Sequence, residues 1–391
     1  MRIFILTSRF PWPLEKGDKL RLYHLARELA AAEHEVVLCA LSDALVSAED
    51  QAKLEAFCTR VHVIQLSWVR RFLRMAWAPV SSRPFQVHWF YQRPAARIIR
   101  KLIAESEPDW IWSHMIRTSE YVKEMHEVPR ALDYMDALSS GMRRRAQLHR
   151  GPYRWILAEE GRRLAQYEAG VLNYFDAQTI ISTADRNLIS HPDRSEIEVV
   201  PNGVDLAHFQ EAQVEPVDLE ATGTVLVFTG NMAYPPNVRA ARRLVLQILP
   251  LIQAPVHVLI AGATPHTTVK QLAGERVTVT GWVDDIRAAY KAGDIFVAPL
   301  DIGTGLQNKI LEAMASGLPC ITTPNVAAGL PGPEPAPLLV ARTDAEWAKA
   351  IEGLIENGGR QTDLARSGQQ FVSKTASWSA AAEKLATTFA T

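Results

Sequence analysis

An alternation of short apolar runs with helical stretches constrains the fold of this chain more than any other feature. Between the first two runs, Leu and Ala residues of Lys19–Glu33 recur at the spacing of one helix face. Nearly continuous apolar strands separated by helices predict a parallel sheet covered on both faces. In the first half of the chain we expect strands over Arg2–Thr7, Glu35–Leu41, Val61–Leu66, Asp109–His114, Ala131–Asp136 and Ala177–Thr183.

A second series of the same kind follows an acidic, proline-containing linker at Glu211–Gly223. Its expected strands are Thr224–Thr229, His257–Ala261, Val277–Thr280, Ile295–Leu300 and Cys320–Thr323. Its expected helices are Asn237–Leu251, Ile286–Ala292 and Leu306–Ser316, and the chain from Asp344 onward is mainly helical in pattern. Because 391 residues exceed one ordinary core, the sequence predicts two Rossmann-like α/β domains facing each other across a cleft. Ligands in such sheets bind beyond the carboxyl ends of the strands.

The composition is that of an ordinary soluble globular protein, with 48% hydrophobic and 22% charged residues. The net charge of −1 gives no argument for nucleic-acid binding. Cys39, Cys58 and Cys320 lie far apart without metal-ligand spacing, and no signal peptide is evident, so we expect buried thiols in a reducing cytoplasm. No apolar run reaches the ~18 residues of a membrane-spanning helix, so any membrane contact is expected to be peripheral.

The clearest chemical signal is the glycine-containing segment GTGLQNKILEAMASG. Gly303 and Gly305 permit a tight bend between a strand and the helix expected from Leu306. The amino end of that helix would present N–H groups and a positive dipole end to phosphate oxygens, with Lys309 as a mobile cation for a diphosphate. Glu312 lies three residues further on and would suit ribose hydroxyls. The alternative is that Lys309 and Glu312 form a surface ion pair on an ordinary helix.

This segment resembles the donor-binding segment of retaining glycosyltransferases of the GT-B fold, family four. Within that family the chain resembles bacterial sugar transferases associated with exopolysaccharide and PEP-CTERM systems. The resemblance covers nearly the whole chain, and further stretches follow the family order: PWPLEKGDKLR, WIWSHM, VVPNGVD and FTGNMAYPPN. It implies an acceptor-binding domain over 1–200, a nucleotide-sugar-binding domain over 201–375 and a C-terminal helix, 376–391, that packs back on the first domain.

The resemblance assigns roles to the glycine-containing segment. Glu312 matches the second glutamate of the family's Glu-x7-Glu motif, which holds the nucleotide ribose. Thr304 stands where the first glutamate is usual, so the carboxylate normally placed against the donor sugar is missing. The Gly303 and Gly305 amides and the Thr304 hydroxyl are the expected substitutes, and this departure leaves the identity of the sugar open.

Two positions of the first domain also match the family. Gly17, with Asp18 beside it, matches the flexible glycine loop against the donor phosphates, although one glycine of the usual pair is absent. The alternative is an ordinary loop. No GxGxxG follows the first strand, which disfavours a dinucleotide-dependent dehydrogenase. His114 ends an expected strand and matches a histidine that faces the donor sugar; the alternative is a structural histidine.

In the second domain, Gly230 and Asn231 of FTGNM follow the first strand. Many relatives place an Arg and a Lys in this region for the diphosphate, whereas here asparagines occupy it. Lys309 and the amino end of its helix would therefore have to balance more of the negative charge of the diphosphate. Gly281, Trp282 and Val283 resemble the loop that contacts the base through its backbone. Trp282 is either a stacking wall for the base or a core residue.

Candidate acids follow another strand of the first domain. Asp133 and Asp136, as an exposed pair, could orient an acceptor hydroxyl or take its proton. The alternative is that Asp136 caps a helix. The predicted catalytic residues are therefore His114, Asp136 and Lys309. The nearest acidic pair for a DxD-type metal site, Asp284–Asp285, is expected to cap the next helix, so neither a metal nor another cofactor is expected.

A basic and aromatic region precedes these acids. From Ala56 to Ala104 the chain has nine Lys or Arg and no Asp or Glu. Large apolar residues alternate with arginines over 68–101, which is typical of a surface that lies on anionic lipid. The alternatives are a solvated basic patch or an RNA-binding surface. We expect the protein to be cytoplasmic and peripheral at the inner face of the cell membrane. A second basic cluster comprises Arg143, Arg144, Arg145, Arg150 and Arg154.

Together, the residues and the resemblance predict a metal-independent, retaining glycosyltransferase. It would move a sugar from a UDP- or GDP-sugar, which is a substrate and not a cofactor, to a lipid-linked or growing saccharide. The resemblance implies front-face attack without a covalent enzyme intermediate. One alternative is a nucleotide-sugar epimerase of the same fold. The other is a non-catalytic nucleotide-sugar-binding subunit, which Thr304 and the absent Arg/Lys pair keep open.

Overall fold

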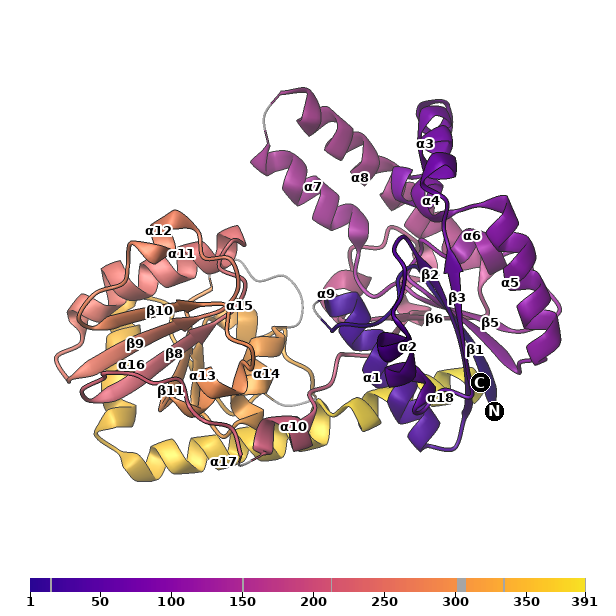
Figure 1. Ribbon diagram of the computed structural model, residues 1–391. Coiled ribbons are helices and arrows are strands. Elements are labelled where there is room, and N and C mark those ends of the chain that lie inside the picture. The colour runs from indigo at the N-terminus through magenta and orange to yellow at the C-terminus, as the bar shows by residue number, and fades with distance from the viewer. Residues whose placement is uncertain (15, 150, 212, 301–306, 333–334, 391) are drawn as a thin grey trace. The chain divides into compact units, whose positions relative to one another are not determined.

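The structure is a computed structural model that describes residues 1–14, 16–149, 151–211, 213–300, 307–332 and 335–390. The chain forms two compact units, Met1–Pro201 with Trp378–Thr391, and Asn202–Ser377. Each unit is built on one parallel sheet with helices packed on it (Figure 1). The predicted fold class, two Rossmann-like α/β domains, is therefore confirmed.

The sheet of the first unit has seven strands in the order β3-β2-β1-β4-β5-β6-β7. The strands are β1 Arg2–Thr7, β2 Glu35–Ser42, β3 Arg60–Gln65, β4 Trp110–His114, β5 Arg130–Asp133, β6 Ala177–Ile180 and β7 Glu198–Val199. β5 ends three residues before the predicted end of its strand at Asp136, and β7 was not predicted because it has only two residues.

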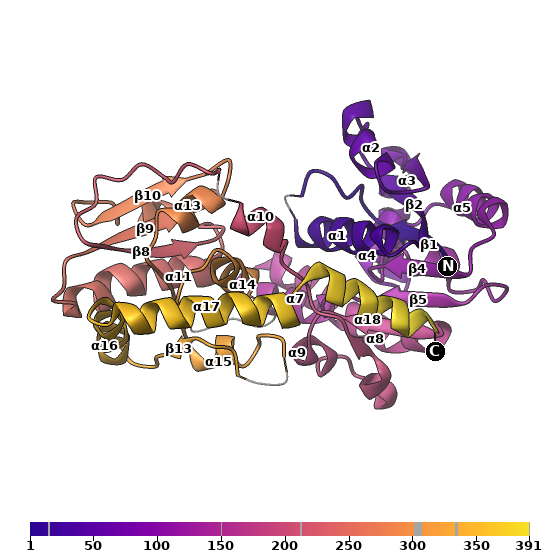
Figure 2. The ribbon, with the colours of Figure 1, turned by 90° about the horizontal axis from the view of Figure 1, so that it is seen from below.

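Both faces of this sheet are buried, which explains the continuous apolar strands. Along β1, Ile3 and Ile5 pack on one face, and Phe4 and Leu6 pack on the other. The first face is covered by α1 and α18, and Trp378 of α18 stacks on His24 of α1 (Figure 2). The helices are α1 Gly17–Ala31, α2 Ala48–Glu55, α3 Trp68–Trp77, α4 Phe85–Phe90, α5 Arg93–Ser106, α6 Ser119–Val122, α7 Leu138–Leu148, α8 Pro152–Val171, α9 Thr183–Arg186 and α18 Trp378–Ala390.

The sheet of the second unit has six strands in the order β10-β9-β8-β11-β12-β13. The strands are β8 Thr224–Thr229, β9 Val256–Ala261, β10 Val277–Gly281, β11 Ile295–Ala298, β12 Cys320–Thr322 and β13 Leu339–Val340. The helices are α10 Leu206–Gln210, α11 Pro235–Arg243, α12 Thr267–Lys270, α13 Arg287–Lys291, α14 Asn308–Ala315, α15 Pro324–Ala327, α16 Asp344–Ile355 and α17 Gly358–Thr375. The single helix predicted over Asn237–Leu251 is instead α11 followed by a π-helical turn, Leu244–Ile248, and a short 3-10 turn.

The cysteines and the apolarity of the helices bear on two further predictions. Cys39, Cys58 and Cys320 are free and buried, as predicted. Among the described residues, no helix has the length and apolarity needed to cross a membrane.

Candidate functional site

The topology of each sheet points to one edge as the place for a ligand. β1 lies between β2 and β4, and β8 lies between β9 and β11, so the winding direction of each sheet changes at β1 and at β8. Ligands of doubly wound sheets bind at the carboxyl ends of the strands beside such a change. In the first unit the strand register pairs Thr7 with His114 and His114 with Asp133, which brings the ends of three strands together.

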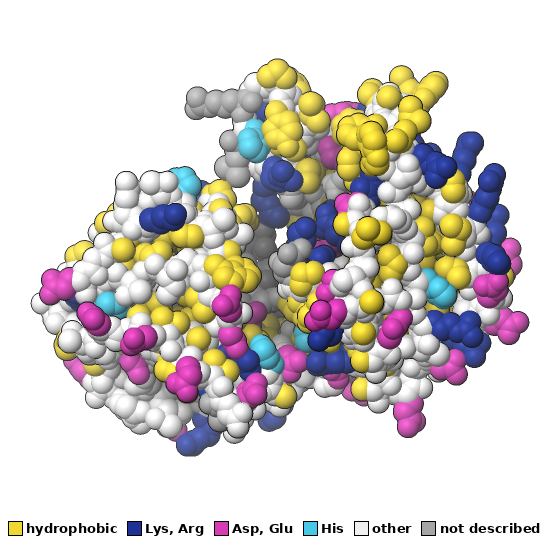
Figure 3. Space-filling view, in the orientation of Figure 1, with side chains coloured by type: hydrophobic (Ala, Val, Ile, Leu, Met, Phe, Trp, Pro, Cys, Tyr) yellow, Lys and Arg dark blue, Asp and Glu magenta, His cyan; other side chains and the backbone are white. Residues whose placement is uncertain are grey.

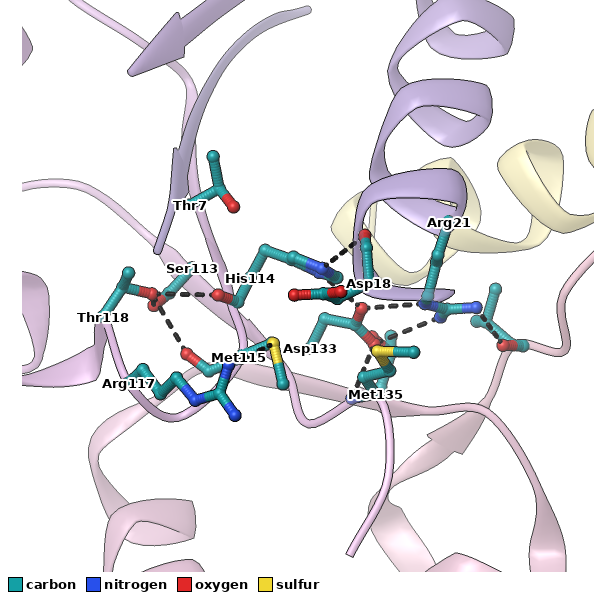
Figure 4. Close-up of polar contacts among 12 residues, drawn as sticks. Thr7, Asp18, Arg21, Ser113, His114, Met115, Arg117, Thr118, Asp133 and Met135 are labelled. Carbon is teal, nitrogen blue, oxygen red and sulfur yellow. Dashed lines mark hydrogen bonds and ion pairs between the residues drawn. The ribbon is translucent and has the colours of Figure 1, made fainter. Parts of the chain in front are cut away.

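A buried network of charged side chains lies at this edge of the first unit (Figure 4). Arg21 of α1 donates to both carboxylate oxygens of Asp133, at 2.8 and 3.1 Å. Both side chains are fully buried, and Arg21 also donates to the Val200 carbonyl. The Asp133 carboxylate also accepts from Thr179 and lies 3.0 Å from Nδ1 of His114. Burial alone would raise the pKa of Asp133, but Arg21 and His114 outweigh it and lower that pKa.

The second ring nitrogen of His114 is also engaged. Its Nε2 lies 3.2 Å from the backbone carbonyl of Asp18, in the first turn of α1. The imidazole is buried, so it connects the end of β4 to the amino end of α1 and holds Gly17 and Asp18 in place. The predicted role of His114 towards the donor sugar stays a prediction. In this structure both of its nitrogens already have protein partners.

Two arginines stabilise the negative charge of Asp18. Its carboxylate pairs with Arg9 at 2.9 Å. Burial acts to raise the pKa of Asp18, but Arg9, His114 and Arg117 prevail and lower it. Arg117 is nearly buried and donates twice to Gln86 Oε1, and burial lowers the pKa of Arg117 to about 10. The edge of the first sheet therefore holds a partly desolvated mixture of cations and acids.

Asp136 differs from the exposed acid of the prediction. Asp133 is fully buried, so the two do not form an exposed pair. Asp136 is half-buried, and its Oδ1 has no hydrogen-bond partner among the described residues. The alternative that Asp136 caps a helix is wrong, because α7 begins at Leu138 without a side-chain cap. Burial and the nearby Asp185 raise the pKa of Asp136 to about 6, against the opposite effect of Arg117.

Two residues directly after the strands hold strained backbone angles. Met115 follows β4 with φ of 67°, and Met135 lies two residues after β5 with φ of 62°. Non-glycine residues in the left-handed region are uncommon and concentrate at functional sites. These angles turn the chain sharply at the edge where His114 and Asp133 end their strands.

The second unit places Lys309 at the corresponding edge of its own sheet. α14 begins at Asn308, two residues later than predicted, so Lys309 lies in its first turn. Its Nζ donates to Asn237 Oδ1 at 2.7 Å and lies 5.1 Å above the Phe228 ring. The Asn237 amide in turn donates to the Asn231 carbonyl. Burial lowers the pKa of Lys309 to about 8.

Gly230 is the residue that leaves room for this lysine. It follows β8 with φ of 148°, a conformation that side chains disfavour. A Cβ built on Gly230 would lie 2.9 Å from Lys309 Nζ and 2.8 Å from Asn237 Nδ2. The predicted donor residues Gly230, Asn231 and Lys309 therefore come together in the structure.

Glu312 does not pair with Lys309 as the surface-ion-pair alternative supposed. Its Oε2 accepts a hydrogen bond from Tyr290 at 2.8 Å, and the Tyr290 hydroxyl lies 3.0 Å from Thr229 Oγ1. Burial raises the pKa of Glu312, against the effects of Tyr290 and Lys309. Sequence reasoning missed Tyr290, whose position in a short expected helix gave no sign of a polar partner.

The remaining donor residues of the prediction lie on two segments. Trp282 is 69% exposed, so the core alternative is wrong, and its indole N–H donates to Asp284. Gly281, the last residue of β10, and Val283 flank it. Asp285 accepts from the Arg287 N–H, but the N-cap of α13 is Ile286 without a side-chain cap, so the predicted capping by the Asp284–Asp285 pair is wrong. Gly303, Thr304, Gly305 and Leu306 lie outside the described residues.

The basic-aromatic region is only partly a surface. Trp89, Phe90 and Tyr91 are half-buried or buried, which contradicts their place in the predicted lipid-facing region. Phe90 and its neighbours lie under the guanidinium groups of α3: Arg71 lies over Trp89 at 5.2 Å, and Arg74 lies over Tyr91 at 4.7 Å. The exposed part of this region includes the outer side of α3, Val80 and Arg83 after it, and the cations of α5.

Two parallel-sheet domains, each with its charged or polar residues at the carboxyl edge, define a class. The chain has the GT-B fold, and each of its two domains matches a family model of glycosyltransferases. The model described as Glycosyltransferase Family 4 matches residues 19–208, and the model described as Glycosyl transferases group 1 matches residues 223–357. A curated relative is the Escherichia coli UDP-Gal:alpha-D-GlcNAc-diphosphoundecaprenol alpha-1,3-galactosyltransferase, 29% identical over 147 residues. That match spans 34% of this chain and 37% of the relative.

Solved structures share the fold along the whole chain. The Anabaena protein Alr3699/HepE, solved in complex with UDP, superposes with a TM-score of 0.66 at 15% identity and covers 100% of both chains. A glycosyltransferase from Rickettsia africae superposes with a TM-score of 0.68 at 12% identity, covering 99% of this chain and 97% of that one. At these identities the likeness concerns the fold alone.

Proposed function

We propose that the protein transfers a sugar from a nucleotide-diphosphate sugar to a lipid-linked or growing saccharide, without a metal ion and with retention of configuration. One observation carries the donor part of the proposal. Lys309 is a half-buried cation whose described partners are a neutral amide and the Phe228 ring, and no carboxylate forms an ion pair with it among the described residues. A desolvated ammonium in this setting is favoured by an anionic ligand, and a diphosphate is the anion that fits a strand–helix edge.

In this proposal the second unit binds the donor. Lys309 and the amino end of α14 would hold the diphosphate and stabilise the negative charge that grows on it as the sugar departs. Glu312, oriented by Tyr290, would accept from the ribose hydroxyls. The E. coli relative is named for UDP-Gal and for a diphosphoundecaprenol-linked acceptor, and HepE has been solved with UDP; both names support a UDP-sugar and a lipid-linked acceptor here.

The acceptor would lie at the carboxyl edge of the first sheet. Asp136 is a half-buried acid there with an unpartnered oxygen, so it is the residue we assign to orient the acceptor hydroxyl and take its proton. Arg21 and Asp133 have no such freedom, because they bind each other. They and His114 act as positioning residues for the first turn of α1.

Replacing Asp136 with Asn is expected to lower kcat by about 100-fold or more, since general-base assistance is typically worth 10²–10⁴. Because the pKa of Asp136 is raised to about 6, the carboxylate is ionised above that pH. We therefore expect kcat/KM of the wild type to fall as the pH drops below about 6, and this limb to vanish in Asp136→Asn. Steady-state rates between about pH 5 and 8 measure this. Asp193→Asn, which changes an exposed acid, is the control and should keep the wild-type profile.

The proposed function is tested by a thermal-shift panel of UDP-, GDP- and ADP-sugars, followed by product analysis by NMR. We expect one base to raise the melting temperature and the sugar to appear on an added acceptor with its anomeric configuration retained. An isomerised donor formed without an acceptor would identify an epimerase instead. Binding without any turnover would identify a nucleotide-sugar-binding subunit.

A peripheral position at the inner face of the cell membrane belongs to the same proposal. It is supported by the exposed apolar and basic side chains of 68–101 and by the lipid-linked acceptor in the name of the E. coli relative. Co-flotation of the protein with vesicles that contain anionic lipid tests it.

A further inference from the structure

Helix α3 of the first unit exposes its apolar side and buries part of its charged side, the reverse of an ordinary surface helix. In a soluble protein the apolar side of such a helix packs on the core and the charged side faces water. On α3, Trp68, Phe72 and Trp77 are 69%, 61% and 72% exposed, whereas Arg71 is 5% exposed. Arg71 and Arg74 point inward over aromatic rings. The exposed side of α3 is therefore a stripe of large apolar residues, completed by Val69 and Leu73.

A second apolar projection lies on the hairpin of α7 and α8. At its tip, Trp155 is 77% exposed, Ile156 is 53% exposed and Tyr153 is 48% exposed. Figure 1 shows that this hairpin and α3 extend beyond the rest of the first unit on the same side. In Figure 3, hydrophobic side chains gather at the ends of both projections. Two separate protrusions that point the same way can reach one common plane.

The charges around these projections indicate what covers them. Residues 137–158, which include α7 and the start of α8, contain no Asp or Glu, and neither does α3. Arg143, Arg145 and Arg154 are exposed on the hairpin. A second copy of this chain would bring the same arginines together, which is unfavourable. RNA would need several outward cations on α3, but of its three arginines Arg70 alone is exposed, whereas Arg71 and Arg74 lie over aromatic rings. An anionic lipid surface suits both the exposed tryptophans and the arginines.

We propose that the outer side of α3 and the tip of the α7–α8 hairpin insert together into an anionic bilayer, as two anchors of the first unit. α3 contributes apolar insertion, and the arginines of α7 contribute attraction to anionic headgroups. α7 starts two residues after Asp136, so the hairpin connects the lipid surface to the carboxyl edge of the first sheet. A lipid-linked acceptor could then reach that edge while its chain stays in the membrane. This last consequence rests on the proposed transfer activity, whereas the bilayer contact is argued from α3 and the hairpin alone.

The test uses the full chain and vesicles of phosphatidylethanolamine and phosphatidylglycerol at a ratio of about 3:1. We expect Trp68→Ser/Phe72→Ser and Trp155→Ser/Ile156→Ser each to weaken flotation by about tenfold or more, at low and at high salt, because buried apolar area drives insertion. Arg143→Gln/Arg145→Gln should weaken it at low salt alone. Trp282→Ser is the matched control, since Trp282 is equally exposed but lies in the second unit, and it should float like the wild type.

Unchanged flotation of both apolar double variants, with unchanged melting temperatures, would overturn the proposal. So would sedimentation showing a wild-type dimer that the Trp155→Ser/Ile156→Ser variant converts to a monomer, because a second copy would then cover the tip. If the proposed function is correct, the two apolar double variants should keep the wild-type transfer rate with a water-soluble short-chain acceptor. Their transfer rate with a bilayer-embedded acceptor should fall. If no acceptor is glycosylated by any variant or by the wild type, the proposed function fails, and the flotation result still decides the bilayer contact.

Discussion

Replacing Lys309 with Ala is expected to reduce kcat/KM by about 100- to 1000-fold, the usual cost of removing one preorganised donor from a developing anion. The side chain donates to Asn237 and has no acidic partner among the described residues, so its charge is available to a diphosphate. Affinity for nucleoside diphosphates, measured by isothermal titration, should fall along with the rate. Because the pKa of Lys309 is lowered to about 8, the wild type should also bind more weakly as the pH rises through that value.

Two further variants make this result specific. Gly230→Ala keeps the cation but places a methyl group 2.9 Å from Lys309 Nζ, so it should also weaken nucleotide binding. Lys270→Ala removes an exposed lysine of the same unit and should bind like the wild type. Full transfer and full affinity in a folded Lys309→Ala protein would show that the donor site lies elsewhere.

Removing the carboxylate of Asp133 is expected to destabilise the first unit by about 3–5 kcal/mol, because it leaves the Arg21 guanidinium buried without its counter-ion. Asp133→Ala also removes the acceptor for Thr179 and His114. Urea unfolding followed by circular dichroism measures the change. The pKa of Asp133 is lowered in the folded state, so its contribution is complete above the unfolded pKa of about 4 and is lost as the pH falls below that value.

The double variant Arg21→Met/Asp133→Leu separates an unpaired charge from a general packing defect. It removes both buried charges, so it should regain part of the stability that Asp133→Ala loses. Glu105→Gln, which changes the exposed partner of Lys101, should leave the unfolding midpoint unchanged. A folded and equally stable Asp133→Ala protein would mean that water or another group satisfies Arg21.

Much of the fold could be predicted because apolar strands buried on both faces leave a strong pattern. The strands Arg2–Thr7 and Thr224–Thr229 were predicted to the residue, and nine others were found with shifts of one to three residues at their ends. The helices α3, α5, α7 and α8 were not predicted. In α3 the apolar stripe exists in the sequence, but the arginines between its members suggested a surface patch rather than a helix with a buried charged side.

The sequence alone also predicted that certain residues of the second unit would lie together. The order of strand, glycine and helix brings Gly230 and Lys309 to one sheet edge, since parallel strands end on the same side. The sequence could not show the partners of these residues. Tyr290 and Glu312 are 22 positions apart and meet only because α13 packs beside β8 and α14 packs beside the neighbouring strand β11.

By itself, then, the sequence determined two parallel-sheet domains and the strand ends at which chemistry would lie, because burial periodicity is a local property of the chain. The tertiary structure alone decided which polar groups bind other protein groups and which remain free to bind a ligand. Asp133 and Asp136 look alike in LDYMDALS, yet Arg21, 112 positions before Asp133, neutralises one and leaves the other with an unpartnered oxygen. Pairing and desolvation depend on contacts between distant segments, and those contacts decide the charge that each acid carries.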